Sequence, residues 1–299
     1  MNDSRKALLD IAHTLATRLL RIVPEAKDID WRVEQAAVWR GDDPVKGFVA
    51  HPERDDIGLD DLLQIDRQKA LLEDNTRQFL SGFPANNVLL WGARGTGKSS
   101  LVHGLLNRYA DEGLRLVEVN KTHLAMLPDI VRKLREQPYR FLLFCDDLSF
   151  GDDDDHYKTL KSALEGSIFR SSGNTLVYAT SNRRHLLPEY MSENTGAAVV
   201  DGELHQSEAV EEKISLSDRF GLCLSFYPFK QSEYLVVARH WVETLARRNA
   251  LPCAWNDELE KESLSWALGR GVRSGRTAEH FARHWVGRAM LQRADSREF

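Results

Sequence analysis

The sequence is poor in cysteine and contains no long apolar run. Its three cysteines lie far apart and form no C-x-x-C pair, so neither a disulfide framework nor a zinc site is expected. No apolar segment approaches the roughly 20 residues needed to cross a bilayer. The first 20 residues are interrupted by charged side chains such as Asp10 and Arg18, unlike a signal peptide. These absences predict a soluble cytoplasmic protein without a membrane partner.

The sequence also lacks any internal repeat, and its 19 glycines and 9 prolines follow no period, which excludes collagenous and low-complexity classes. A hydrophobic content of 42% excludes disorder of the whole chain. The net charge of −5 argues against a general nucleic-acid binder, although residues 229–299 carry 12 basic and only 9 acidic side chains. At 299 residues the chain can hold one large domain or two to three small ones.

The first 59 residues are expected to form a helical extension. Apolar residues between Leu8 and Ile22 recur at spacings of three and four, which places them on one face of a helix. From Asp28 to Leu59 the pattern is poorer and contains turn signals around Pro44 and Pro52. A second helix is expected near residues 64–80, where a Gly and a Pro follow it.

Residues 60–228 show short apolar strands that alternate with longer helical patterns. The expected strands cover residues 88–91, 114–119, 141–145, 175–179 and 222–226, and the expected helices lie near residues 98–112, 127–136, 156–169 and 208–220. Such alternation is typical of an α/β fold with a parallel sheet that is covered on both faces. After Pro228 only helical patterns remain, near residues 232–249, 257–268 and 276–294, so residues 229–299 should form a small all-α domain.

The strongest motif is Gly92-Ala93-Arg94-Gly95-Thr96-Gly97-Lys98-Ser99, which fits G-x-x-x-x-G-K-[ST] between an expected strand and an expected helix. In such a loop the glycines let backbone N–H groups surround phosphate oxygens at a helix N-terminus. Lys98 would reach the outer phosphates of ATP, and the hydroxyl of Ser99 would ligate Mg²⁺. The candidate nucleotide-binding residues here are Gly92, Gly95, Thr96, Gly97, Lys98, Ser99 and Ser100.

A second motif, residues 141–147, is an apolar strand that ends in two carboxylates. It looks like a Walker B segment, in which Asp146 would hold Mg²⁺ through water and Asp147 would act as general base for the attacking water. The alternative is two acidic residues at the mouth of a loop. Because Asp147 stands where related proteins usually have Glu, one methylene longer, the sequence supports nucleotide binding more firmly than fast hydrolysis.

A third strand, residues 175–179, runs into Thr180, Ser181 and Asn182. With this element the arrangement resembles the AAA+ ATPases, in which a polar residue at the tip of this strand, called sensor 1, positions the lytic water. Asn182 fits that role best, with Thr180 or Ser181 as alternatives. A simple helix N-cap remains a competing interpretation.

The same resemblance assigns roles to two arginines. Arg219, in Leu216-Ser217-Asp218-Arg219-Phe220-Gly221, stands where AAA+ proteins carry the arginine finger that reaches the γ-phosphate in a neighbouring subunit. Pairing with Asp218 or with the C-terminal end of its helix is the alternative. Arg276, which begins the last expected helix, stands at the sensor 2 position of the AAA+ lid, and Arg273 is the reserve candidate.

The resemblance covers residues 60–299, and details such as Glu-Glu-Lys-Ile-Ser-Leu-Ser-Asp-Arg-Phe-Gly look like a bacterial AAA+ family catalogued only as a domain of unknown function. It implies an AAA+ three-layer P-loop core with a parallel sheet, a helical lid, an N-terminal helical extension, and self-association into an oligomer. The implied activity is hydrolysis of ATP with Mg²⁺ to remodel a partner, first of all a protein. A nucleotide-switched loader or scaffold for DNA or a helicase is the alternative, and a small-molecule kinase has no place for the lid arginine.

Overall fold

The computed structural model describes residues 29–41, 46–51, 56–150, 156–165, 173–183, 186, 198–200, 203–205 and 217–295. The helix expected near residues 8–22 lies outside the described residues, and so does most of the helix expected near residues 208–220.

A seven-stranded sheet forms the centre of the fold, in the order β2-β1-β4-β5-β6-β3-β9. Neighbouring strands are parallel, except for the antiparallel pair of β1 with β2. The strands are β1 (Ala36–Arg40), β2 (Gly47–Ala50), β3 (Val88–Gly92), β4 (Leu114–Glu118), β5 (Arg140–Cys145), β6 (Thr175–Ser181) and β9 (Leu222–Phe226). Two further strands, β7 (Ala198–Val200) and β8 (Glu203–His205), pair only with each other.

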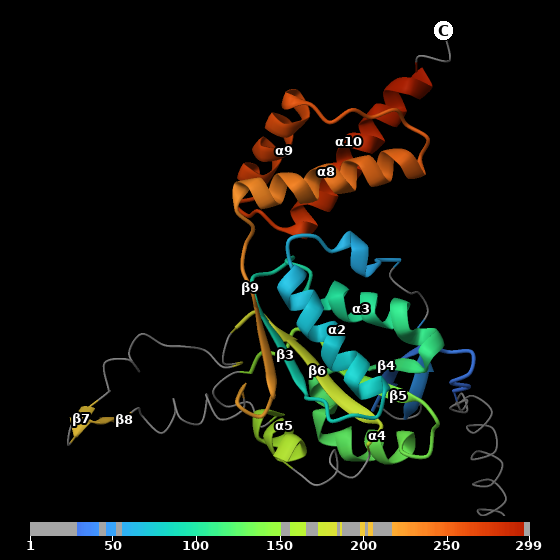
Figure 1. Ribbon diagram of the computed structural model, residues 1–299, viewed down its shortest axis with the longest axis vertical. Helices are drawn as coiled ribbons and strands as arrows, with labels where there is room; N and C mark the ends of the chain where they lie inside the picture. Colours follow the sequence, from blue (N-terminus) through green and yellow to red (C-terminus); the bar gives the residue numbers. More distant parts are fainter. Residues whose placement is uncertain are drawn as a thin grey trace, which may run out of the picture.

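Helices cover both faces of this sheet (Figure 1). Because side chains alternate along a strand, Leu90 of β3 packs with α2 (Asp66–Leu80) and α3 (Lys98–Tyr109). Its neighbour Leu89 packs on the opposite face with α4 (Leu127–Leu134) and α5 (His156–Glu165). Both leucines are fully buried, which explains why the central strands are continuous apolar runs.

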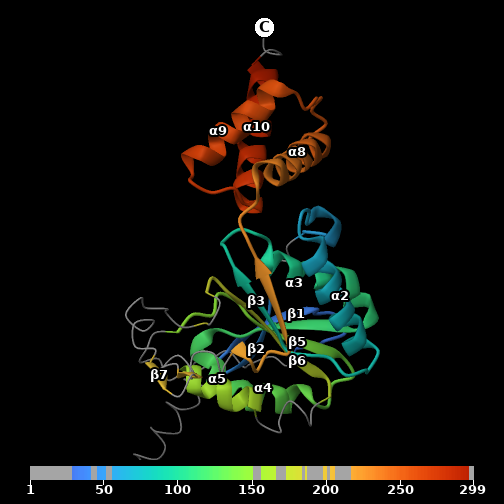
Figure 2. The same cartoon turned by 60° about the vertical axis from the view of Figure 1, so that its left-hand side comes forward.

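The C-terminal residues form a separate layer of three helices, α8 (Gln231–Arg248), α9 (Asp257–Gly269) and α10 (Gly275–Asp295). Figures 1 and 2 show this lid above the core, at the end of the sheet where β9 leads into α8. The hydroxyl of Tyr234, fully buried on α8, donates to the carbonyl of Ser263 on α9 and holds the two helices together. Within the described ranges no helix is both long and apolar enough to cross a membrane.

The expected helical extension over residues 1–59 is wrong for residues 36–40 and 47–50, which form β1 and β2. Strand β1 pairs in parallel with β4, with Ala36 opposite Leu116, so the core sheet begins well before residue 60. The buried guanidinium of Arg115 on β4 donates to the carbonyl of Trp31 at 2.7 Å and fixes the chain that leads into β1. The pairing partner of β1 is β4, about 80 residues later, and β2 in turn pairs with β1.

Candidate functional site

The P-loop lies between β3 and α3, as its sequence predicts. Gly92 has a φ of 131°, and a Cβ atom there would lie 1.9 Å from the carbonyl oxygen of Phe226, so no other residue fits. Gly97, with a φ of 96°, is the N-cap of α3. The loop therefore has the tight backbone path that turns N–H groups toward a bound anion.

Lys98 lies at the base of this loop and is only 7% exposed. Its ammonium donates to the carbonyls of Gly92 at 2.9 Å and Ala93 at 2.8 Å, and it lies 3.4 Å from Oδ1 of Asn182. Burial lowers the pKa of Lys98, and the carboxylates of Asp146 and Asp147 oppose that shift. The ammonium is thus a partly desolvated charge, held by weak carbonyl acceptors that phosphate oxygens would replace.

The two aspartates after β5 have different partners. Oδ1 of Asp146 accepts from the hydroxyl of Ser99 at 2.7 Å and from the hydroxyl of Thr180 at 2.5 Å. The side-chain amide of Asn182 donates to Oδ1 of Asp147. The structure therefore brings the P-loop serine to the first acid and the residue at the tip of β6 to the second.

Thr180 connects the two aspartates, because its hydroxyl also accepts from the backbone N–H of Asp147 at 2.9 Å. Asp147 has a φ of 50°, in the left-handed region that a non-glycine residue seldom adopts. Such a conformation persists where neighbouring contacts impose it, here those from Thr180 and Asn182. Ser181, fully buried, instead donates to the carbonyl of Leu148 and faces the interior. Of the three candidates for sensor 1, Thr180 and Asn182 line the cavity and Ser181 does not.

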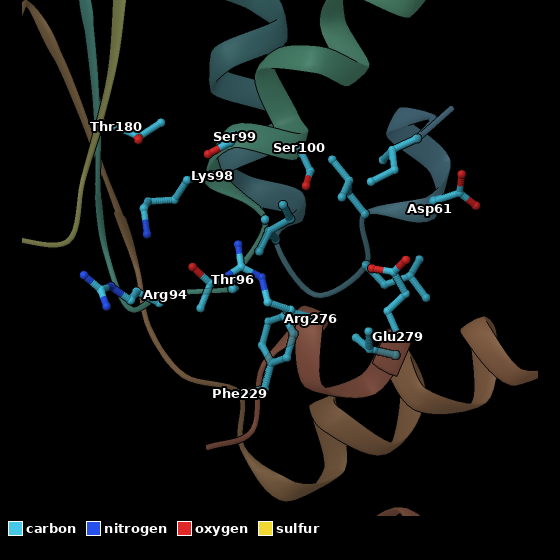
Figure 3. Close-up of a pocket in the computed structure, with 18 of the residues that line it drawn as sticks. Asp61, Arg94, Thr96, Lys98, Ser99, Ser100, Thr180, Phe229, Arg276 and Glu279 are labelled. Carbon is cyan, nitrogen blue, oxygen red and sulfur yellow. The ribbon is translucent and has the colours of Figure 1, made fainter. Parts of the chain in front are cut away.

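A cavity of about 440 Å³ lies over the P-loop, between the core and the lid. Figure 3 shows Lys98, Ser99 and Thr180 on one side of it and Arg276 and Phe229 of the lid approaching from below. The residues that the sequence predicted and that line this cavity are Gly95, Thr96, Gly97, Lys98, Ser99, Ser100, Asp146, Asp147, Asn182 and Arg276. Gly92 does not line it and acts through its carbonyl contact with Lys98.

The end of the cavity away from Asp146 and Asp147 is mainly apolar, and the sequence analysis did not predict it. It is formed by the chain before α2 and by the lid, with Ile57, Asp61, Leu62, Leu63, Ile65, Phe229, Val237 and Trp241. Trp241 is 8% exposed and belongs to the core, yet it also forms a wall of the cavity. No motif marks these residues, because apolar side chains that line a pocket look like core residues in a sequence. Arg94 and Glu279 also line the cavity and were not predicted.

Of the two lid arginines, Arg276 lines the cavity and Arg273 does not. The backbone N–H of Arg276 donates to the carbonyl of Gly95 at 3.2 Å, so the first turn of α10 contacts the tip of the P-loop directly. Gly95 has a φ of 73°, and a Cβ atom there would lie 2.8 Å from the hydroxyl of Ser274. Arg273 contributes its carbonyl, which accepts from the backbone N–H of Phe229.

Arg219 is exposed and lies three residues before β9, outside the cavity of its own chain. Its neighbour Phe220 is 3% exposed and anchors the segment in the core. The role of Arg219 as an arginine finger in a neighbouring subunit stays a prediction.

The oxygen donors of Ser99 and Asp146 fit Mg²⁺, which prefers hard ligands and usually takes one or two carboxylates together with substrate phosphates. In the part of the chain that the structure describes, no group of three or more His, Cys, Asp or Glu side chains could hold a metal ion by itself.

Comparison with known proteins agrees with this architecture. The family model described as "Protein of unknown function (DUF815)" matches residues 32–289. The chain is similar to the Aeropyrum pernix ORC1 protein, solved in complex with DNA, with a TM-score of 0.52 and 14% identity over 77% of this chain and 61% of that one. The Thermotoga maritima RuvB Holliday junction branch migration motor matches with a TM-score of 0.47 and 19% identity, over 76% of this chain and 63% of RuvB. No curated protein matches the chain in sequence.

At 14% identity the ORC1 structure shows the fold alone. The chain spans less than two thirds of the length of ORC1 and RuvB. The family match, by contrast, covers most of the chain, including β1 and the lid. The sheet order, the P-loop between β3 and α3 and the helical C-terminal part agree with the expected fold class. The chain therefore belongs to the DUF815 family and has the fold of an AAA+ P-loop protein.

Proposed function

We propose that the chain binds ATP with Mg²⁺ in the cavity between core and lid and hydrolyses it to ADP and phosphate. One observation carries this proposal. Lys98, both aspartates and Asn182 come from three separate segments and all line one cavity, in which Asn182 contacts Lys98 and Asp147 while Asp146 contacts the P-loop Ser99. A buried cation beside two carboxylates and a glycine-rich loop is the arrangement that phosphoryl transfer requires.

The contacts support a distinct role for each group. Lys98 would turn from its two carbonyl acceptors to the outer phosphates, and Ser99 with Asp146 would hold Mg²⁺, directly and through water. Asp147 would accept the proton of the attacking water, and Asn182, which contacts Asp147, would orient that water. The bound cation would offset charge on the phosphoryl oxygens.

The two ends of the cavity suit the two ends of ATP. The triphosphate would lie along the P-loop, with Arg276 of the lid beside it. The apolar end, with Leu62, Val237 and Trp241, would take the flat base, whose burial stabilises binding by removing apolar surface from water.

In our proposal the free energy of ATP hydrolysis serves to rearrange a macromolecular partner, in the first place a protein. A neighbouring copy would supply Arg219, which lies outside the cavity of its own chain. A DNA or helicase loader with slow hydrolysis is the alternative, since ORC1, solved in complex with DNA, shares the fold. The net charge of −5 disfavours direct DNA binding, and salt-dependent binding of labelled duplex DNA in the presence of ATP would favour that alternative.

The central test compares Lys98→Ala with Lys133→Ala by calorimetric titration with Mg²⁺-ATP. Lys133 is an exposed lysine on α4 that does not line the cavity, so its variant is matched in charge and should bind like the parent. Lys98→Ala should lose about 100-fold or more in affinity, because the phosphates lose a partly desolvated positive charge. Equal affinity of the two variants would contradict the proposal.

A second variant separates binding from chemistry. Asp147→Asn should keep its affinity for Mg²⁺-ATP and release phosphate about 100-fold more slowly, because an amide does not accept the proton of the attacking water. Unchanged phosphate release would show that Asp147 is not the base.

A further inference from the structure

The turn that precedes α2 is a fixed part of the core. It contains the short helix η1 (Leu59–Asp61), whose Leu59 packs against Gly104 of α3, where a Cβ atom would lie 2.8 Å from its side chain. The ammonium of Lys69 donates to the carbonyls of Leu59 and Leu62, each at 3.1 Å. The side-chain amide of Asn107 holds the carbonyl of Ile57 at 3.0 Å. These contacts hold the turn against α2 and α3 of the core.

The lid is a second rigid body, which begins at Phe229. The backbone N–H of Phe229 donates to the carbonyl of Arg273, so this residue moves with the lid helices. The buried Tyr234 ties α8 to α9, and the fully buried Val242 packs α8 into the lid interior. Only the short link that contains Tyr227 and Pro228 separates this body from β9.

One side-chain hydrogen bond joins these two bodies at the apolar end of the cavity. Nε2 of His240 on α8 lies 3.1 Å from Oδ1 of Asp61 on η1. The other oxygen, Oδ2, accepts from the backbone N–H of Gly58 at 3.1 Å, which holds the carboxylate in the orientation that meets the imidazole. The two side chains are 20% and 26% exposed, for Asp61 and His240 respectively, so water competes with this bond only in part.

His240 has a position that separates it from the binding residues. It does not line the cavity, whereas its neighbours Val237 and Trp241 on α8 do, as does Asp61 itself. Figure 3 shows Asp61 across the cavity from Thr180, whose hydroxyl donates to Asp146. A change at His240 therefore alters how the apolar wall is held without removing a group that would touch the nucleotide.

We propose that the Asp61–His240 pair is a latch that holds the lid against the core and so sets how long a nucleotide stays bound. The proposal rests on the proposed function of the cavity. At the phosphate end, the lid is held by the backbone contact of Arg276 with Gly95. At the apolar end, the latch supplies the second point, and α8 swings away from Leu62 when it opens. His240 is thus a positioning residue and not a catalytic one.

The test measures the rate at which a fluorescent ADP analogue leaves the full-length protein after an excess of unlabelled ADP is added. His240→Leu removes the donor, and dissociation should become about fivefold faster or more. His240→Gln places an amide N–H near the position of Nε2, and its rate should return to within about twofold of the parent. His280→Leu is the matched control, because His280 is an exposed histidine of α10 outside the cavity.

A mutant cycle shows whether the two residues act on each other. Asp61→Asn should accelerate dissociation in the parent and have a smaller effect in the His240→Leu background, because the bond is already absent there. Melting temperatures of all variants report whether the fold is kept. A merely structural role of His240 would lower the melting temperature of His240→Leu without changing the dissociation rate, and that result would overturn the latch.

Different results would refute the latch and the proposed function of the cavity. A parent protein that does not bind the ADP analogue overturns both proposals. A parent that binds it, with His240→Leu and His280→Leu releasing it at the parent rate, overturns the latch alone. Equal acceleration by His240→Leu and His240→Gln would also overturn it, since the hydrogen bond would not be the cause.

Discussion

Thr180→Val tests whether the two aspartates work as one connected unit. Valine keeps the volume of threonine and removes only the hydroxyl. Thr180 is 2% exposed, and its hydroxyl makes two hydrogen bonds. The backbone N–H of Asp147 then loses its acceptor, and Asp146 loses a donor at 2.5 Å. An unpaired, partly buried N–H costs about 1–2 kcal/mol, and the exposed Asp146 regains much of its loss from water. We expect the free energy of unfolding to fall by about 2 kcal/mol.

The effect on turnover should exceed the effect on binding. Asp147 has a φ of 50° and relies on Thr180 and Asn182 for its placement, so the loss of one contact should misplace its carboxylate. Phosphate release should slow by about 10- to 100-fold, since small misplacements at a reacting centre have effects of that order. Affinity for Mg²⁺-ATP should stay within about threefold, because the P-loop is unchanged.

Urea denaturation and a phosphate-release assay measure the two quantities, and Thr180→Ser is the control. Serine keeps the hydroxyl and both hydrogen bonds, so its stability should lie within about 1 kcal/mol of the parent. If Thr180→Val is as stable and as active as the parent, the contacts between Thr180 and the aspartates have no energetic consequence and the reasoning is refuted.

Three further predictions concern the P-loop and assembly. Arg219→Ala should bind ATP but hydrolyse it poorly. Mixing it with Lys98→Ala should restore part of the phosphate release, because the first variant supplies an intact pocket and the second an intact Arg219. If light scattering shows that the two variants assemble together and phosphate release still does not recover, action in trans is ruled out. Gly95→Ala should weaken ATP binding by about tenfold in calorimetry, because the φ of 73° at this position disfavours alanine and the new Cβ would lie 2.8 Å from Ser274. An affinity equal to that of the parent would contradict a close contact between the P-loop and Ser274. Burial lowers the pKa of Lys98 in the free protein, whereas bound phosphates favour its charged form. The affinity for ATP should therefore fall as the pH rises through this lowered pKa, and binding near that pH should take up protons. Calorimetric titration in buffers of different ionisation enthalpy measures this proton uptake.

The central strands were predictable because each is a continuous apolar run bounded by polar residues. The strand expected at residues 222–226 agrees with β9, and those expected at 88–91 and 141–145 agree with β3 and β5 to within one residue. Their parallel pairing followed from the helices between them. The P-loop was predictable for a related reason: its glycines are required by local backbone geometry, as Gly92 and Gly97 show.

Strands β1 and β2 were missed because their local pattern is weak. Two alanines begin β1, and Gly47 begins β2, and neither residue favours a strand. The edge of β4, whose backbone N–H and C=O groups need partners, pairs with β1, and β1 in turn pairs with β2. Tertiary pairing of this kind leaves no mark in a short segment of sequence.

The two ends of the cavity also differ in how well the sequence predicts them. The phosphate end is built from three segments that each carry a motif readable in the sequence: the P-loop and the ends of β5 and β6. The apolar end requires Leu62 from the core and Trp241 from the lid, which are about 180 residues apart and meet only when the lid is in place. If ATP binds as proposed, a nucleotide that contacts both bodies stabilises the closed lid. By linkage, if bound nucleotide raises the affinity of a partner for the closed lid by some factor, that partner must raise the affinity for nucleotide by the same factor. A partner that favours the open lid must lower the affinity for nucleotide in the same reciprocal way. In the proposed function, work done on a partner and release of ADP would therefore be coupled through the position of α8.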